Sequence, residues 1–166
     1  MYRSIGDFTL DWKYESEATL KVLRALTDES LSQKVTQDGR SLGFLGWHVA
    51  LTLGEMGSRM GLNVTAPPED AEQPAHAADI ASAYEAGSRS VLQAVRSSWS
   101  DASLEEEVAM YGDKWKRGYA LSSLVKHQIH HRAQMTVLMR QAGLKVPGIY
   151  GPSKEEWAHM GLPPQK

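Results

Sequence analysis

Three histidines near the end of the chain, in the segment VKHQIHHRAQM, have residue types and spacing that suit metal binding. His127 and His131 are four residues apart, and residues at that spacing face the same side of an α-helix. Both imidazoles can then reach one point about 2 Å from each ring nitrogen, as a divalent metal requires. His130 lies roughly 100° around the helix from His131 and should not reach that point. The spacing predicts either a two-histidine metal clamp or two core histidines held by hydrogen bonds.

A candidate third ligand, His48, lies in the apolar and glycine-rich segment LGFLGWHVALTLGEMG. On a helix it shares a stripe with Leu45, Thr52 and Met56, so it is expected to face the core, as a structural histidine or as a ligand. The chain has no cysteine, which excludes thiolate ligands, disulfides and a cysteine nucleophile. Three neutral imidazoles from neighbouring helices would leave one position open, as in catalytic zinc sites. Zinc is favoured, with nickel, cobalt or iron as alternatives, because imidazole ligands discriminate weakly between these metals.

Other catalytic signatures are absent from the sequence. There is no H-E-x-x-H motif, phosphate-binding glycine loop or nucleophile elbow. A di-iron bundle needs paired Glu-x-x-His motifs, and the single such spacing, Glu156 with His159, lies in the tail and is interpreted as chance. Glu55 follows His48 by two helical turns and is interpreted as a surface or packing partner. We therefore assign no catalytic acid or base.

Four amphipathic segments are predicted to position these side chains, because apolar residues recur in them at helical spacing. The segments run from Asp7 to Leu26, Ser41 to Met60, Ala77 to Trp99 and Leu121 to Gly143. Asp7 or Thr9 can cap the first helix and Ser41 the second. No strand is expected, and residues 63–75 and 101–119 form connectors long enough to cross a bundle. We predict an all-α fold, a four-helix bundle with long crossover connections, in a single domain spanning residues 1–166.

Charge and hydropathy narrow the class of partners. The formal net charge is −2, so the composition does not favour nucleic-acid binding, which needs a basic face. The N-terminal sequence MYRSIGDFTLDW has no uninterrupted apolar run of the kind that signal peptides contain. The longest apolar run, Gly43 to Gly54, is too short to span a bilayer. We expect a cytoplasmic protein that binds neither nucleic acid nor membranes.

Two segments of the chain resemble the DinB/YfiT-like superfamily. The segment LVKHQIHHRAQMTVLMRQAGLKVPGIYG is similar to the last bundle helix of that family, in which an H-x-x-x-H-R-x-Q pattern precedes a hydrophobic segment and a proline-containing tail. The segment SLGFLGWHVAL is similar to the second helix, which carries the first metal histidine. The resemblance implies that His48, His127 and His131 bind one divalent metal ion per chain, zinc or nickel. It also implies packing roles or contacts with the ligands for Arg132 and Gln134.

The resemblance also implies a class of reaction. Characterised relatives are metal-dependent transferases and isomerases that use low-molecular-weight thiols such as bacillithiol or mycothiol. We therefore expect a metal-dependent thiol S-transferase with a small-molecule substrate; a metal-dependent hydrolase and a non-catalytic metal-binding stress-response module are the alternatives. A homodimer is expected from the resemblance and from a second apolar row on the last helix, formed by Leu121, Val125, Ile129 and Ala133.

Overall fold

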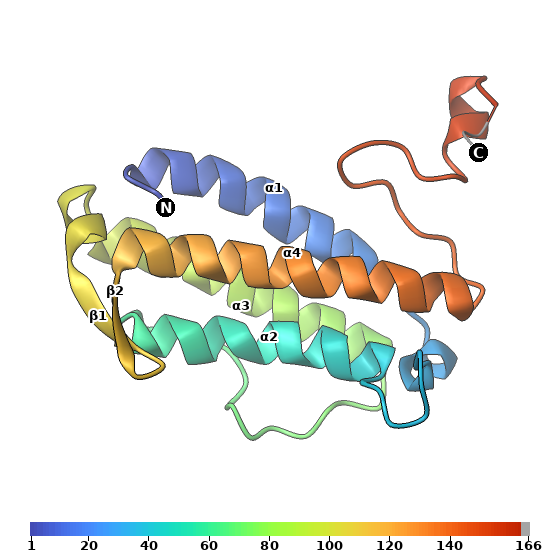
Figure 1. Cartoon of the computed structure of the whole chain (residues 1–166), viewed down its shortest axis with the longest axis horizontal. Helices are drawn as coiled ribbons and strands as arrows, with labels where there is room; N and C mark the ends of the chain where they lie inside the picture. Colours follow the sequence, from blue (N-terminus) through green and yellow to red (C-terminus); the bar gives the residue numbers. More distant parts are fainter. Residues whose placement is uncertain (164–166) are drawn as a thin grey trace.

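Four α-helices run side by side in the structure, a computed structural model that describes residues 1–163 (Figure 1). They are α1 (Ile5–Arg24), α2 (Leu42–Arg59), α3 (Ala77–Ser98) and α4 (Arg117–Gln141). α1 and α2 each pack against both α3 and α4, so every helix has two neighbours. The predicted four-helix bundle is confirmed, and the two helices that carry the candidate ligands, α2 and α4, are neighbours.

The core lies between the helices and is built from the apolar stripes that the sequence predicts. Phe8 and Trp12 of α1 and Tyr84 of α3 are at most 1% exposed. Trp12 Nε1 donates a hydrogen bond to the backbone oxygen of Ser88 at 3.0 Å, so its one polar atom is satisfied inside the core. Burying one large apolar side chain stabilises a fold by about 1.5–3 kcal/mol. The stripes therefore hold the helices together far more than intrinsic helix propensity does.

Serine side chains decide where α1 and α2 begin. Ser41 Oγ accepts a hydrogen bond from the backbone N–H of Phe44 at 3.1 Å, and the cap predicted for α2 is confirmed. α1 begins at Ile5, earlier than predicted. The reason is that Ser4 Oγ accepts from the backbone N–H of Asp7 at 3.3 Å, so the cap lies before Asp7 rather than at Asp7 or Thr9.

The connection from α2 to α3 returns along the bundle, because these two helices run in the same direction (Figure 1). The connecting residues follow α2 backwards. Val64 lies against Gly57 near the end of α2, and the Ala71 carbonyl oxygen accepts from Trp47 Nε1 at 2.8 Å near its start. A Cβ atom at Gly57 would lie only 2.6 Å from a Val64 methyl, so the close approach requires glycine there. The predicted crossover is confirmed, and it forms a wall beside α2.

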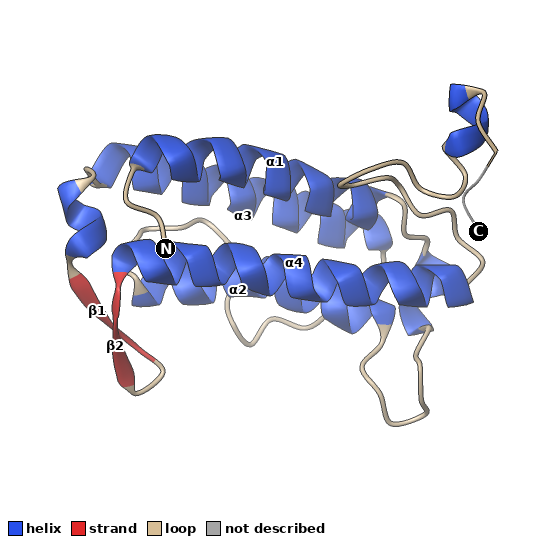
Figure 2. Ribbon diagram, turned by 45° about the horizontal axis from the view of Figure 1, so that its top comes forward, coloured by secondary structure: helices blue, strands red, loops and turns tan. Residues whose placement is uncertain are grey.

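A short β-hairpin occurs where the sequence indicates an irregular connector, so the expectation of no strand is wrong (Figure 2). Strands β1 (Glu107–Met110) and β2 (Asp113–Lys116) pair antiparallel. Tyr111 and Gly112 have φ angles of 51° and 87°, which is the backbone of the two-residue turns that fit the twist of a hairpin. Strands of four residues are too short to show a clear period of two. Because the hairpin ends at Lys116, α4 starts at Arg117 rather than at the predicted Leu121.

Within residues 1–163, three 3₁₀ helices complete the secondary structure: η1 (Asp28–Ser32), η2 (Ala102–Glu105) and η3 (Trp157–Met160). η1 lies against α2, and η2 lies against α4. In this part of the chain, none of the helices combines the length and the apolar character that crossing a bilayer requires.

The second apolar row of α4 is divided between the core and the surface. Leu121 and Val125 are buried within the single chain, whereas Ile129 is half-buried and Ala133 is exposed. The buried half of the row therefore contributes to the bundle itself. The expected homodimer stays a prediction.

Candidate metal centre

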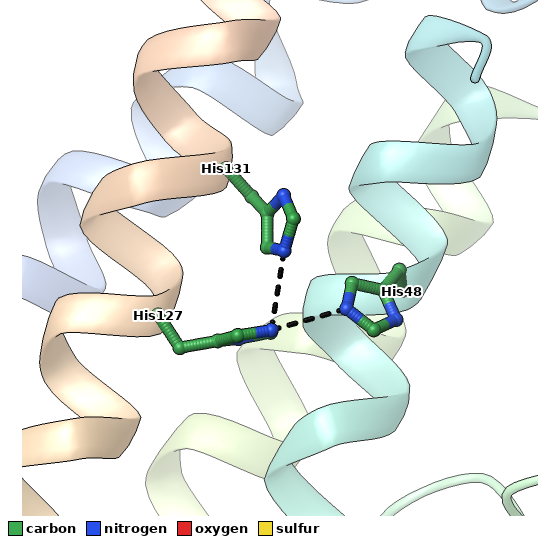
Figure 3. A group of neighbouring side chains, drawn as sticks. All are labelled: His48, His127 and His131. Atoms are coloured by element: carbon green, nitrogen blue, oxygen red, sulfur yellow. Dashed lines mark hydrogen bonds between the residues drawn. The ribbon is translucent and has the colours of Figure 1, made fainter. Parts of the chain in front are cut away.

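The three candidate histidines converge between α2 and α4 (Figure 3). His48 comes from α2, and His127 and His131 come from successive turns of α4. His127 Nε2 lies 3.1 Å from His48 Nε2 and 3.1 Å from His131 Nε2. Three nitrogens bound to one tetrahedral zinc ion at about 2.0–2.1 Å lie roughly 3.3 Å apart. Two of the three separations are close to this value, and all three ligand atoms lie within 4.8 Å of one another, so the cluster can hold one small divalent ion. The histidines form the one such cluster of His, Asp and Glu side chains found among residues 1–163.

The ring nitrogens of this cluster cannot all be satisfied by one another, because a neutral imidazole has only one N–H and one lone pair. His131 Nδ1 lies 2.7 Å from Gln134 Oε1, an acceptor, so Nδ1 carries the proton and Nε2 presents a lone pair. His127 Nε2 has two ring nitrogens as neighbours but can donate a hydrogen bond to only one of them. The other nitrogen of this ring, His127 Nδ1, is buried without a hydrogen-bond partner among the described residues. A cation at the point of convergence would satisfy all three Nε2 lone pairs, so the donor set fits a divalent metal.

Gln134 fixes the orientation of His131. Its hydrogen bond to Nδ1 sets both the tautomer and the ring plane, which is the common arrangement behind metal-binding histidines. The family resemblance implies either helix packing or a contact with the ligands for this residue. The structure places it in contact with a candidate ligand, one helical turn further along α4.

Burial keeps all three imidazoles in the neutral form that metal binding requires. Burial, followed by the charges of His131, His48 and His130, lowers the pKa of His127 from 6.5 to about 4. Burial is also the main cause that lowers the pKa of His48, and the charges of His131 and Arg40 add to it. The pKa of His131 is lowered by burial and by the charges of His130 and Arg40, although the hydrogen bond to Gln134 opposes this.

These lowered pKa values predict how the stability of the metal-free protein depends on pH. Well above pH 6.5 the three clustered histidines are neutral in both the folded and the unfolded chain, so their protonation does not change the free energy of unfolding. As the pH falls from 6.5 toward about 4, the unfolded chain binds protons that folded His127 does not, and the free energy of unfolding decreases. Urea unfolding at a series of pH values should show this decrease in metal-free protein.

The variant His127→Gln isolates this effect from the general titration of carboxylates. The substitution removes the group of the cluster whose pKa is lowered most. Between pH 6.5 and about 4, the free energy of unfolding of the variant should therefore depend less steeply on pH than that of the wild type. His159→Gln, in the exposed tail, serves as the matched control and should reproduce the wild-type slope. Identical slopes for wild type and His127→Gln would contradict the assigned neutral state.

A pocket of about 760 Å³ opens beside the cluster, and His48 and His127 form part of its wall. Aromatic side chains from α2 and the hairpin supply much of the remaining surface, and Ser123 adds a hydroxyl one turn before His127 on α4. The aromatic and aliphatic lining residues are Phe44, Trp47, Leu51, Met56, Ala71, Tyr111 and Trp115. A ligand in this pocket would therefore contact apolar walls and two of the three candidate metal ligands at once.

The hairpin forms one wall of this pocket and is fastened to α2. Tyr111 Oη donates a hydrogen bond to Glu55 Oε2 at 2.7 Å, and Arg59 pairs with the same carboxylate. The Arg59 guanidinium carbon lies 5.0 Å from the centre of the Tyr111 ring. Glu55 thus fixes the wall, consistent with its interpretation as a packing partner. Tyr111 and Trp115 were not predicted from the sequence as pocket residues. The signal that could have indicated them was the unusual length of their connector.

Arg132, next to His131 in the chain, is buried and pairs with a buried glutamate of α1. Its Nη2 lies 2.6 Å from Glu15 Oε2, and the two side chains are 3% and 6% exposed. Tyr150 Oη donates to Glu15 Oε1 at 2.7 Å, which fastens the C-terminal segment to the bundle. The packing role expected for Arg132 is therefore what the structure shows. Glu15 was missed, although its position on the apolar stripe between Trp12 and Thr19 was a readable signal.

The other histidines lie outside the cluster. His130 is exposed and, as the helical wheel predicts, is not part of the three-histidine group. His76 precedes α3 and pairs with Asp28 at 2.8 Å. His159 is exposed in the tail, and Glu156 accepts hydrogen bonds from the backbone N–H groups of Gly148 and Ser153. These contacts support the interpretation of the Glu156 and His159 spacing as chance.

Comparisons with known proteins agree with this architecture. A model of the DinB family matches residues 1–166. The uncharacterised protein YrdA of Bacillus subtilis (strain 168) is 45% identical over 162 residues, which cover 98% of this chain and 97% of YrdA. A crystal structure of a DinB-like protein from Bacillus cereus ATCC 10987 aligns with a TM-score of 0.87 and 40% identity over 90% of this chain and 100% of that one. The DinB-like protein YjoA of Bacillus subtilis aligns with a TM-score of 0.69 and 16% identity, over 86% of this chain and 96% of YjoA, and shares the fold.

Proposed function

The chain belongs to the DinB family, and from this membership and its three-histidine cluster we propose that it is a metal-dependent enzyme that transfers a low-molecular-weight thiol to an electrophile. His48, His127 and His131 would hold the metal, with zinc as the favoured ion and nickel as an alternative. The observation that carries the proposal is the 760 Å³ pocket, which opens directly on two of the three candidate ligands.

The ligand set and the pocket together favour an enzyme over a storage or structural metal site. Structural zinc sites are closed by four protein ligands, whereas catalytic sites keep one position open. Only three His, Asp or Glu side chains converge here in the described part of the chain. A divalent metal, when bound at such a site, lowers the pKa of a thiol or water ligand and keeps the resulting anion beside an electrophile.

The side chains of the protein would position the reactants. Gln134 holds the His131 ring in the orientation that directs Nε2 to the convergence point. Aromatic walls from Trp47 and Trp115 suit an apolar electrophile and exclude water from it. Ser123 places a hydroxyl in the same pocket, within reach of polar groups on a bound substrate. The substrate itself supplies the thiol, since the chain has no cysteine.

A turnover assay tests this proposal. Zinc-loaded protein should catalyse the reaction of a small thiol with an activated aryl halide: a carbon–sulfur bond forms, the carbon–halogen bond breaks, and the thiol proton passes to the buffer. The rate should saturate with the thiol, disappear on chelation and return when metal is added back.

The assay also separates the alternative functions. Metal-dependent turnover of an ester or amide in thiol-free buffer would contradict the transferase and indicate a hydrolase. Stoichiometric metal without any turnover would contradict both enzymes and indicate a non-catalytic metal-binding module. His127→Ala protein is the negative control, because it lacks a ligand that also forms part of the pocket wall.

A further inference from the structure

Arg40 lies beside the histidine cluster at the start of α2. Its guanidinium carbon is 5.0 Å from the centre of the Phe44 ring, and the Phe44 ring in turn stacks on the His48 ring with 5.9 Å between centres. A single aromatic side chain therefore separates the guanidinium from a candidate metal ligand.

Arg40 also lines a small hollow together with residues of α4. Arg40 and Leu45 share the lining of a hollow of about 360 Å³ with Gln134 and Val137 of α4. Gln134 is the residue that holds His131 Nδ1. On α4, the larger pocket is lined by residues up to His127, whereas the hollow is lined by residues after His131. On α2, the larger pocket extends from Phe44 to Arg59 and so reaches toward Arg40 on one side of His48 and toward the hairpin on the other. A ligand bound at the cluster would therefore have apolar pocket walls extending toward the hairpin and a guanidinium beyond Phe44 near the start of α2.

Arg40 differs from most arginines of this protein because its charge is not compensated. Six of the nine arginines in the sequence pair with a glutamate. Among residues 1–163, no carboxylate lies within 4.0 Å of the Arg40 guanidinium, and the side chain is exposed. A guanidinium offers five N–H donors in a planar fork that matches a carboxylate.

We propose that Arg40 binds a carboxylate group of the thiol substrate whose sulfur is held at the His48, His127 and His131 cluster. The inference rests on the proposed function and narrows it, because the preferred thiol is then an acid with a spacer long enough to pass the Phe44 ring. The part of the apolar pocket that extends toward the hairpin remains free for the electrophile. Arg40 is a specificity-determining residue in this arrangement.

Binding of matched thiols to cobalt-loaded protein tests the proposal without requiring turnover. Mercaptohexanoate and mercaptohexanol have the same length and differ in one terminal group, a carboxylate or a hydroxyl. Binding of sulfur is followed by the charge-transfer absorption between thiolate and cobalt, and metal content is measured for every variant. Wild-type protein should bind the acid roughly tenfold more tightly, the value expected for one charge-assisted hydrogen-bonded pair. Added salt should reduce this preference, because the guanidinium is exposed.

Three variants separate the role of Arg40 from a general effect of charge. Arg40→Gln should bind the two thiols equally, and Arg40→Lys should keep part of the preference, because it keeps the charge but loses the planar fork. Arg96→Gln removes the same charge from the exposed surface of α3 and should behave like the wild type. Equal binding of both thiols by the wild type, or a preference that survives Arg40→Gln, would overturn this proposal alone. Absence of the absorption band with every thiol would overturn the thiol-binding step of the proposed function, and this inference with it.

Discussion

Replacing His127 with alanine should lower the affinity for a divalent metal by roughly a hundredfold to a thousandfold, if the ligands share the binding free energy of zinc sites about equally. His127 is the most informative single position, because its Nε2 lies 3.1 Å from the Nε2 atoms of both His48 and His131. Its loss leaves two imidazoles that no longer surround one point. The double variant His127→Ala with His131→Ala should retain no stoichiometric metal when prepared without an immobilised-metal column.

The neighbouring His130 provides the matched control for this experiment. It lies on the same helix and directly precedes His131, with 5.0 Å between the centres of the two rings, but its side chain is exposed and is not one of the three clustered ligands. His130→Ala should therefore keep the wild-type metal content and affinity, and so should His76→Ala and His159→Ala. Metal analysis of each purified variant and competition with a chromophoric chelator would give these values. Stoichiometric metal in the double variant would refute the proposed ligand set.

Replacing Arg132 with methionine should destabilise the fold by about 3–5 kcal/mol, the cost of leaving a buried charge without its partner. Arg132 and Glu15 are 3% and 6% exposed, so water cannot replace the lost guanidinium. Arg132 also donates to the Glu15 backbone oxygen at 3.0 Å and to Tyr150 Oη at 2.6 Å. Chemical denaturation of metal-free protein at neutral pH measures the change without a contribution from metal binding.

Two further variants show whether the burial of the pair causes this loss. Arg24→Met removes an arginine whose pair with Glu85 lies at the surface, where the two side chains are 59% and 32% exposed. This substitution should change the free energy of unfolding by no more than about 1 kcal/mol. Adding Glu15→Leu to Arg132→Met should recover much of the lost stability, because the unpaired charge is then absent. A loss below about 1 kcal/mol for Arg132→Met would mean that the pair is not buried in solution as it is in the structure.

The sequence by itself determined the four long helices and the faces that they present. The helical period of apolar residues fixes which side of each segment must be buried, since the period is a property of the local chain. His127 and His131 were recognisable as a pair for the same reason, because an interval of four residues on a helix sets their relative direction wherever the helix lies. The cap of α2 at Ser41 was equally local, because donor and acceptor are three residues apart in the chain.

Only the tertiary structure decided which faces meet. The residues around His48 in the sequence do not indicate that α2 packs against α4. His48 can act as the third ligand only because of that contact. The pairing of Arg132 with Glu15 is of the same kind, because it joins residues separated by 117 positions. The hairpin depends on pairing between strands too short to carry a pattern, and its closure over α2 turns a polar connector into a pocket wall. Local sequence sets the direction of each side chain along its own element, whereas the distance between side chains on different elements depends on how the whole core packs.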